Sequence, residues 1–357
     1  MTIGIITFHC AINYGAILQT YGLQEYLQSL GHTVYIIDYR PDYLLSQYKY
    51  FRPQNHNNLY ELSTWFIREL LTTPIKWRRK QNFKKFTKKY LNLKYIDFTQ
   101  NINTFDTFIF GSDQIWNTNI TNGYDPIFTG DFEAAKGKRL VVYGASAGDI
   151  SNISASLIDY LKNVPYHMIG VREKQLQCFL QQNNIPSQLV LDPILLAGQS
   201  TFKKLIKNRK NRHNKYLLLF TLNREGCAIE YANKIAKEHN FKIIEIISAK
   251  ESLQNYLKIK QTLSPEDFLE YLWNASYIVT TSFHGTAFSI LFKKDFNSII
   301  INKNERISSL LHLVNLESRI IYNGDKTINT ESINYTTVNK KLDKARKESM
   351  LFIKNIQ

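Results

Sequence analysis

Short runs of apolar residues alternate along the chain with longer segments in which apolar positions recur every three or four residues. The short runs are typical of buried parallel strands, and the longer segments are typical of amphipathic helices. In the first half, this spacing predicts a helix over 16–29 that ends before Gly31, a residue that favours helix termini. Strands are expected at 3–8, 33–39, 107–110, 139–143, 167–171 and 188–191. The alternation predicts a Rossmann-like domain.

The same pattern resumes after residue 215. Strands are expected at 216–222, 242–247, 277–281 and 297–301, and Ser264 followed by Pro265 is typical of a helix start. Residues 197–215 between the two sets are polar and strongly basic, which predicts a linker. We therefore expect an α/β protein of two Rossmann-like domains facing a cleft, as in GT-B proteins. The expected parts are an N-terminal domain over 1–196, a C-terminal domain over 216–335 and a final helix over 336–357.

One segment of the first domain, residues 65–90, has an unusual composition. It carries nine Lys or Arg residues and one Glu, interleaved with Trp65, Phe66, Trp77, Phe83, Phe86 and Tyr90. Basic residues mixed with aromatic ones can bind an anionic membrane, a lipid diphosphate or a nucleic acid. The alternative is an amphipathic helical hairpin whose aromatic side chains pack on the domain.

Composition limits the classes of binding partner and the cellular compartment that we expect. The 357 residues suffice for two domains, and the formal charge of +15 favours polyanionic partners, which include nucleic acids, lipid headgroups and phosphorylated substrates. Cys10, Cys178 and Cys227 are too far apart for a CxxC metal or redox motif. No apolar run approaches the ~20 residues of a membrane span, and the N-terminus has no signal-peptide pattern. We expect a cytoplasmic protein, with the inner face of the membrane as an alternative site within the cytoplasm.

The most specific candidate motif is TTSFHGT at residues 280–286. It follows an apolar strand and precedes a helix expected at 287–292, so His284 is expected at a ligand-binding sheet edge. A histidine there can transfer protons near neutral pH, and the helix N-terminus suits a phosphate or carboxylate. Gly285 would let a ligand approach the backbone. A structural histidine bonded within the loop is the alternative.

Three further loops follow predicted strands. Arg172 comes directly after the strand at 167–171, where a guanidinium can clamp a carboxylate or phosphate, unless it is a surface residue of a helix start. The loops after the other strands can supply backbone amides and polar side chains to a sugar or phosphate. Their candidate residues are Asn13, Tyr14, Gly15, Ser112, Asp113 and Ser146.

Common cofactor and metal motifs are not found in the sequence. The loop at 13–16 matches neither GxGxxG nor GxxxxGK[ST], and no HExxH, EF-hand or GxSxG string is present. No metal and no cofactor are therefore predicted. Asp192 precedes Pro193 and is interpreted as a residue that ends a strand and turns the chain.

The ordered motifs together resemble the polysaccharide pyruvyl transferase family. The strings that carry the resemblance lie between residue 4 and about residue 320: NYGAILQTYGLQ, FGSDQIWN, YGASAG, GVREKQ, VLDPILL, SPEDF, ASYIVTTSFHGTAFSILF and NERISSLL. The resemblance implies two Rossmann-like domains, phosphoenolpyruvate as donor and a pair of sugar hydroxyls as acceptor, with a pyruvate ketal as product. The acceptor it implies is a cell-surface polysaccharide or its polyprenyl-diphosphate-linked precursor.

The resemblance also assigns roles to residues. His284 matches the histidine of the family's His-Gly motif, and Arg172 matches the arginine after the mid-domain strand. Other members have an arginine two residues before the histidine, where this chain has Ser282 followed by Phe283, and Arg306 is a candidate for the missing charge. A nucleotide-sugar glycosyltransferase, a non-catalytic polysaccharide-assembly protein and a nucleic-acid-binding protein are the alternatives, although the last has no usual binding motif here.

Overall fold

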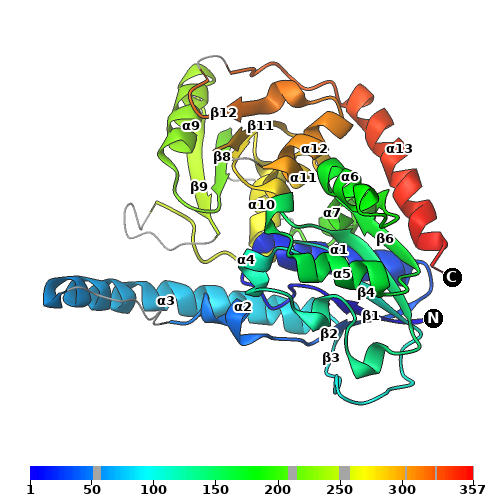
Figure 1. Cartoon of the computed structure of the whole chain (residues 1–357). Helices are drawn as coiled ribbons and strands as arrows, with labels where there is room; N and C mark the ends of the chain where they lie inside the picture. Colours follow the sequence, from blue (N-terminus) through cyan, green and yellow to red (C-terminus); the bar gives the residue numbers. More distant parts are fainter. Residues whose placement is uncertain (51–57, 208–214, 249–257, 302–303, 326–327, 357) are drawn as a thin grey trace.

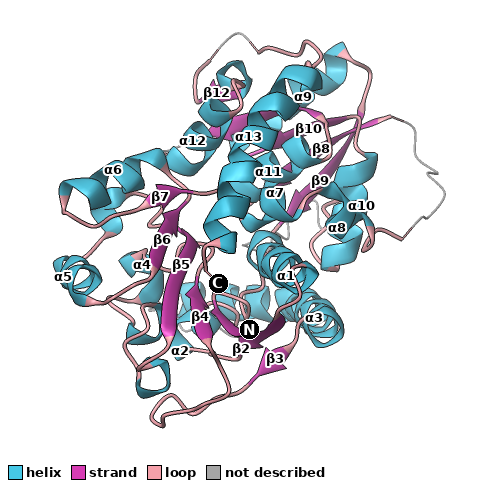
Figure 2. Ribbon diagram, turned by 90° about the vertical axis from the view of Figure 1, so that its right-hand side faces the viewer, coloured by secondary structure: helices cyan, strands magenta, loops and turns pink. Residues whose placement is uncertain are grey.

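The chain folds around two parallel sheets, which Figures 1 and 2 show from two directions. The computed structural model describes residues 1–50, 58–207, 215–248, 258–301, 304–325 and 328–356. Strands up to residue 189 form the first sheet, and strands from residue 216 onward form the second. The prediction of two Rossmann-like sheets in an α/β fold is confirmed.

The first sheet has the strand order β3-β2-β1-β4-β5-β6-β7, with all pairs parallel. Ile5 of the central strand lies opposite Ile36 on one side and Ile109 on the other, and all three are fully buried because helices cover both faces. Its strands are β1 (Thr2–Ile6), β2 (Thr33–Ile37), β3 (Leu93–Lys94), β4 (Thr107–Phe110), β5 (Arg139–Ala145), β6 (Met168–Val171) and β7 (Gln188–Leu189). Its helices are α1 (Tyr14–Ser29), α2 (Asp42–Ser46), α3 (Leu59–Tyr90), α4 (Thr118–Thr121), α5 (Ala155–Asn163), α6 (Lys174–Gln182), α7 (Pro193–Ala197) and α8 (Gln199–Lys203).

The second sheet has the order β12-β11-β10-β8-β9 and is also parallel throughout. Its strands are β8 (Tyr216–Thr221), β9 (Lys242–Ile247), β10 (Tyr277–Thr280), β11 (Asp295–Ile300) and β12 (Ile320–Tyr322). The helices are α9 (Gly226–Glu238), α10 (Pro265–Asn274), α11 (Phe283–Leu291), α12 (Glu305–Leu313) and α13 (Tyr335–Lys354). Single 3₁₀ turns occur at Pro126–Phe128, Glu133–Ala135, Ile150–Asn152 and Glu317–Arg319.

Two local predictions are wrong. The helix after β10 begins at Phe283 rather than at 287, because the Ser282 side chain caps it by accepting a hydrogen bond from the Gly285 amide. Residues 65–90 form part of one long helix, α3, and not a hairpin. In the predicted linker, residues 199–203 form α8, whereas 208–214 lie outside the described residues.

The two sheets share a continuous apolar core. In Figure 2 the helices α1, α7, α10 and α11 lie between the sheets. Tyr14 of α1 stacks on Phe268 of α10 with ring centroids 4.4 Å apart, and its hydroxyl donates to the Leu263 carbonyl. Phe202 and Phe288 meet edge to face in the same layer. Aromatic packing of this kind fixes the orientation of one domain on the other.

The final helix, α13, leaves the second domain and returns to the first. The Ser349 hydroxyl accepts a hydrogen bond from the Leu191 amide, and the Phe352 ring packs on Tyr143 of β5. The carbonyl of Ile356 accepts a hydrogen bond from Arg139. Both ends of the chain therefore lie close together at the first domain, as Figure 1 shows.

Candidate active site between the domains

His284 lies in the first turn of α11, immediately beyond the carboxyl end of β10. This is the sheet edge where ligands of open α/β sheets bind. The imidazole is 6% exposed, and no hydrogen-bond partner of its Nε2 atom lies within the described residues. A buried, unpartnered ring nitrogen is free to exchange a proton or a hydrogen bond with a ligand.

Gly15 supports the imidazole from the opposite domain. A Cβ atom at this position would lie 1.9 Å from the Nδ1 atom of His284, so the ring rests directly on the backbone of α1. The contact seen for Gly15 is thus with the imidazole, and its predicted contact with substrate stays a prediction. Gly285 also has a packing role, because a Cβ there would meet the Thr280 hydroxyl and the Phe220 ring.

Replacing Gly15 with Ala is expected to displace the His284 ring and to lower turnover by about tenfold or more. In a helix with open space at that position, Gly→Ala stabilises the helix by about 1 kcal/mol. Any loss of turnover or stability in Gly15→Ala would therefore come from the clash between the new Cβ atom and His284. Steady-state kinetics and thermal unfolding measure both effects. Gly226→Ala is the matched control, because Gly226 has open space around its Cβ position. Unchanged turnover in Gly15→Ala would contradict the contact.

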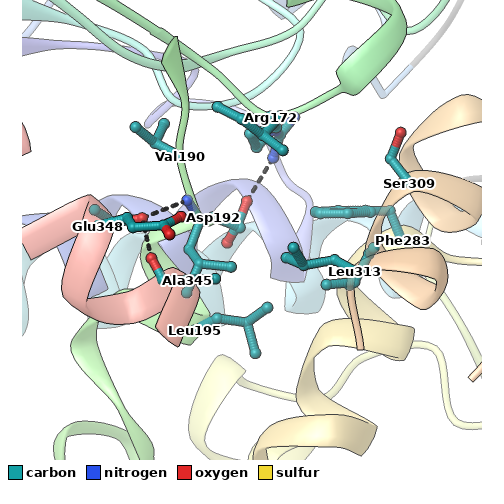
Figure 3. A pocket seen from close by; sticks show the side chains of 13 residues that line it. Arg172, Val190, Asp192, Leu195, Phe283, Ser309, Leu313, Ala345 and Glu348 are labelled. Atoms are coloured by element: carbon teal, nitrogen blue, oxygen red, sulfur yellow. Dashed lines mark hydrogen bonds and ion pairs between the residues drawn. The ribbon is translucent and has the colours of Figure 1, made fainter. Parts of the chain in front are cut away.

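Arg172 is held in the centre of the site by Asp192. It follows β6, and its Nη1 atom donates to Asp192 Oδ2 over 2.5 Å, the pair drawn in Figure 3. The other oxygen of Asp192 caps α7 by accepting from the Ile194 amide. Arg172 Nη2 lies 3.6 Å from Asp113 Oδ1. Because both partners are buried, the guanidinium has a fixed position and stays charged.

Asp192 also links the two domains, since its Oδ2 atom is 3.8 Å from His284 Nε2. Sequence reasoning missed this residue by treating it only as a turn residue. It is indeed the N-cap of α7, but its second oxygen faces Arg172 and His284. Its position a few residues beyond a strand of the parallel sheet was the one available signal.

The ring of Phe283 lies within cation–π distance of two guanidinium groups. The Cζ atom of Arg172 is 4.9 Å from the ring centroid and that of Arg306, from the first turn of α12, is 5.8 Å away. The ring face is attractive to both cations, which lets two like charges approach one another. Arg306 therefore joins the site predicted around His284.

Several buried polar atoms of this cluster have no hydrogen-bond partner within the described part of the chain. They are Nε and Nη2 of Arg172, Nε of Arg306, Nε2 of His284 and both carboxyl oxygens of Glu173. An unsatisfied buried polar group is costly, so such a concentration marks a place that a polar ligand fills. The unused guanidinium donors suit an anion.

Burial and charge shift the pKa values in opposite directions. Burial lowers the pKa of His284, against the pull of Asp192 and Asp113, which favours a neutral imidazole in the free protein. Burial raises the pKa of Glu173 although Arg172 opposes it. Burial also opposes ionisation of Asp113, yet electrostatic interactions with His284, Arg172 and Arg306 lower its pKa below the usual value.

Two adjacent cavities open on this cluster, and Phe283 lines both. The first is lined by residues that include Asn13, Asp113, Ser282, His284 and Arg306. The second is shown in Figure 3; its polar lining residues are Arg172, Asp192, Ser309, Glu348 and Ser349, and the rest of its lining is apolar. Arg172 and His284 thus converge from opposite domains on Asp192 but line neighbouring cavities.

Three predicted binding residues do not reach either cavity. Tyr14 is buried in the aromatic layer between the domains. Ser112 is fully buried, and its hydroxyl donates to the Gly144 carbonyl. The Ser146 hydroxyl accepts a hydrogen bond from the Gly148 amide. Tyr14 thus packs between the domains and the two serine hydroxyls bond to loop backbone, and substrate contact by these three residues stays a prediction.

Several solved structures match nearly the whole chain at low sequence identity. UDP-N-acetylglucosamine 2-epimerase from Rickettsia bellii shares 10% identity at a TM-score of 0.49, over 99% of this chain and 95% of that chain. The MnaA–UDP structure from S. aureus shares 14% identity at a TM-score of 0.47, over 98% of this chain and 90% of that chain. ADP-heptose LPS heptosyltransferase II from E. coli shares 11% identity at a TM-score of 0.37, over 98% of this chain and 100% of that chain. These likenesses concern the fold alone.

Sequence comparison identifies the family. Among curated proteins none matches the chain. The profile of the family described as polysaccharide pyruvyl transferase, however, matches residues 13–302, a stretch that includes Gly15, Arg172, Asp192 and His284. A match over this much of the sequence shows that the chain belongs to the polysaccharide pyruvyl transferase family.

Proposed function

We propose that this protein transfers the enolpyruvyl carbon skeleton of phosphoenolpyruvate to two hydroxyls of a sugar and forms a pyruvate ketal. The observation that carries the proposal is the set of buried donors without a hydrogen-bond partner among the described residues, on Arg172, Arg306 and His284, in a chain of this family. Phosphoenolpyruvate presents a carboxylate and a phosphate, and each can accept the forked donors of a guanidinium. The donor substrate is the only small molecule that the proposed reaction needs besides the sugar.

The proposed chemistry starts at the methylene carbon of the donor. Addition of a proton converts this carbon to a methyl group and makes the adjacent carbon oxocarbenium-like. One sugar hydroxyl adds there and loses its proton, the carbon–oxygen bond to phosphate breaks, and the second hydroxyl closes the ketal. Of the two hydroxyl protons, one balances the proton taken up by the methylene and the other leaves with phosphate.

His284 is proposed as the proton-transfer residue. In the free protein burial lowers its pKa, whereas a bound carboxylate and phosphate would add negative charge beside it and favour the imidazolium. Asp192, 3.8 Å from Nε2, stabilises the charged form in the same way. The proton is thereby drawn to the ring when the donor is present, where general acid catalysis contributes about 10²–10⁴-fold.

The acceptor is proposed to be a sugar unit of a cell-surface polysaccharide or of its lipid-linked precursor, and the site of action to be the cytoplasm. The cavity that Asn13, Asp113 and Ser282 line offers amide, carboxylate and hydroxyl groups next to His284. Such groups are typical partners of sugar hydroxyls.

The proposal is tested by incubating the protein with phosphoenolpyruvate and a panel of galactosides and mannosides. Release of inorganic phosphate that depends on the sugar, together with a mass gain of the sugar that matches a ketal, is expected. If the protein instead releases a nucleoside diphosphate from a nucleotide sugar and ignores phosphoenolpyruvate, the chemistry is glycosyl transfer and the proposal is wrong.

A further inference from the structure

Among the described residues, the contacts that join the long helix α3 to the two sheets lie mainly in its C-terminal half. Phe83 and Phe86 are buried, Phe83 packing against Tyr14. Arg79 and Asn82 donate to backbone carbonyls of the second domain, at Gln261 and Thr262. The N-terminal half continues beyond these anchors and projects from the molecule, as the left side of Figure 1 shows.

The projecting half carries large apolar side chains on its solvent side. Leu59 is 84% and Tyr60 76% exposed, and the same face continues through Ile67, Leu70, Leu71 and Trp77, each more than half exposed. At 3.6 residues per turn, these positions lie opposite the buried Thr72, Ile75 and Arg79. An apolar face that points away from the protein needs a partner.

The exposed face changes from apolar to basic along the helix. Beyond Trp77 the same arc of the helix presents Arg78, Lys80, Lys84, Lys85, Lys88 and Lys89, all exposed. Residues 77–90 contain no Asp or Glu. We call the whole face, from Leu59 to Lys89, the α3 stripe. The 18 residue steps from Leu59 to Trp77 span about 27 Å of helix.

We propose that the α3 stripe binds the surface of an anionic lipid bilayer. The apolar half enters the boundary between headgroups and acyl chains with its axis in the membrane plane, and the basic half contacts lipid phosphates. None of the described helices is long and apolar enough to cross a bilayer, which agrees with binding at the surface.

Charge argues against a second copy of the chain as the partner. A parallel pair of α3 stripes would place six cations against six cations, and an antiparallel pair would place cations on apolar side chains. Neither arrangement supplies an acid to the basic half, and the net charge of +15 adds repulsion between copies. A bilayer with anionic headgroups supplies both the apolar layer and the counter-charge.

The experiment is co-sedimentation of the full chain with vesicles of equal parts phosphatidylglycerol and phosphatidylcholine, and with vesicles of phosphatidylcholine alone. Wild type is expected to sediment with the anionic vesicles only. A basic variant with Ser at Lys84, Lys85, Lys88 and Lys89 is expected to bind about 10²-fold more weakly or worse, since each basic residue contributes about fivefold. An apolar variant with Ser at Ile67, Leu70 and Leu71 keeps every charge and is expected to lose at least about tenfold.

The matched control replaces Lys340, Lys341, Lys344 and Lys347 of α13 with Ser, which removes four exposed charges from a different helix. This control is expected to bind like wild type. Wild type that stays in the supernatant, or α3 variants that sediment as wild type does, would overturn the proposal. A dimer in analytical ultracentrifugation that the apolar variant dissociates, without vesicle binding, would assign the stripe to a second copy and also overturn it.

Vesicle binding does not rest on the proposed reaction, because neither donor nor acceptor is added. A protein that binds vesicles but releases no phosphate would retain the membrane surface and lose the proposed function. A protein that pyruvylates soluble sugars but does not bind vesicles would keep the proposed function and lose the proposed membrane surface. The two conclusions therefore fail separately.

Discussion

Arg172→Ala is expected to lose both donor binding and turnover. The guanidinium carries two buried donor atoms that lack a hydrogen-bond partner among the described residues, and a hydrogen bond to a charged group contributes about 1.5–3 kcal/mol. Removing the cation also leaves Asp192 buried without its partner, which costs about 3–5 kcal/mol of stability. Donor affinity by calorimetry, phosphate release and thermal unfolding measure the three consequences.

A second substitution separates binding from folding. Arg172→Lys keeps a charge beside Asp192 but loses the forked geometry, so it is expected to fold nearly as wild type does and still bind donor poorly. Arg346→Ala serves as control, because Arg346 is a partly exposed arginine that bonds the Leu195 carbonyl away from His284. Wild-type donor affinity in folded Arg172→Lys would contradict the role of the guanidinium fork.

His284→Ala is expected to reduce turnover by about 10²–10⁴-fold while leaving affinity for phosphoenolpyruvate nearly intact. A proton-transfer group acts mainly in the transition state, whereas the charges that hold the donor are on Arg172 and Arg306. The measurement pairs donor affinity with single-turnover phosphate release. His312→Ala is the control, since His312 is exposed on α12 and pairs with Glu317.

A purely structural histidine would give a different result. His284→Ala would then lower the melting temperature because it leaves a gap above Gly15, while the folded protein would release phosphate at the wild-type rate. That outcome would remove His284 from the reaction. It would leave the placement of Arg172 and Arg306 unaffected.

The sequence predicted the sheets well because their signal is local. Buried parallel strands are continuous apolar runs, and ten of the twelve strands were expected within about two residues of their observed limits. The two that were missed, β3 and β12, have two and three residues and are too short to form a pattern. The expectation that Arg172 and His284 follow strands at their carboxyl ends is likewise a local inference, and the structure places both there.

The remaining features depend on contacts between distant residues. Nothing near Gly15 in the sequence indicates that an imidazole from residue 284 rests on it, and nothing near Asp192 shows that its second oxygen reaches Arg172. Helix α3 presents a related difficulty. Pro74 suggests an interruption, but it lies on the exposed side, where water can solvate the carbonyl that loses its donor. The chain therefore continues as one helix.

The return of α13 to the first sheet has a consequence for protein synthesis. Tyr143 and Leu191 belong to the first domain, yet their partners Phe352 and Ser349 are translated after the whole second sheet. Domains usually fold from the N-terminus as the ribosome proceeds. Here the first sheet cannot complete its packing until residues 335–356 have emerged, so its unfinished face stays exposed while the second domain is made. The nascent chain therefore carries an open apolar surface that a chaperone is suited to shield.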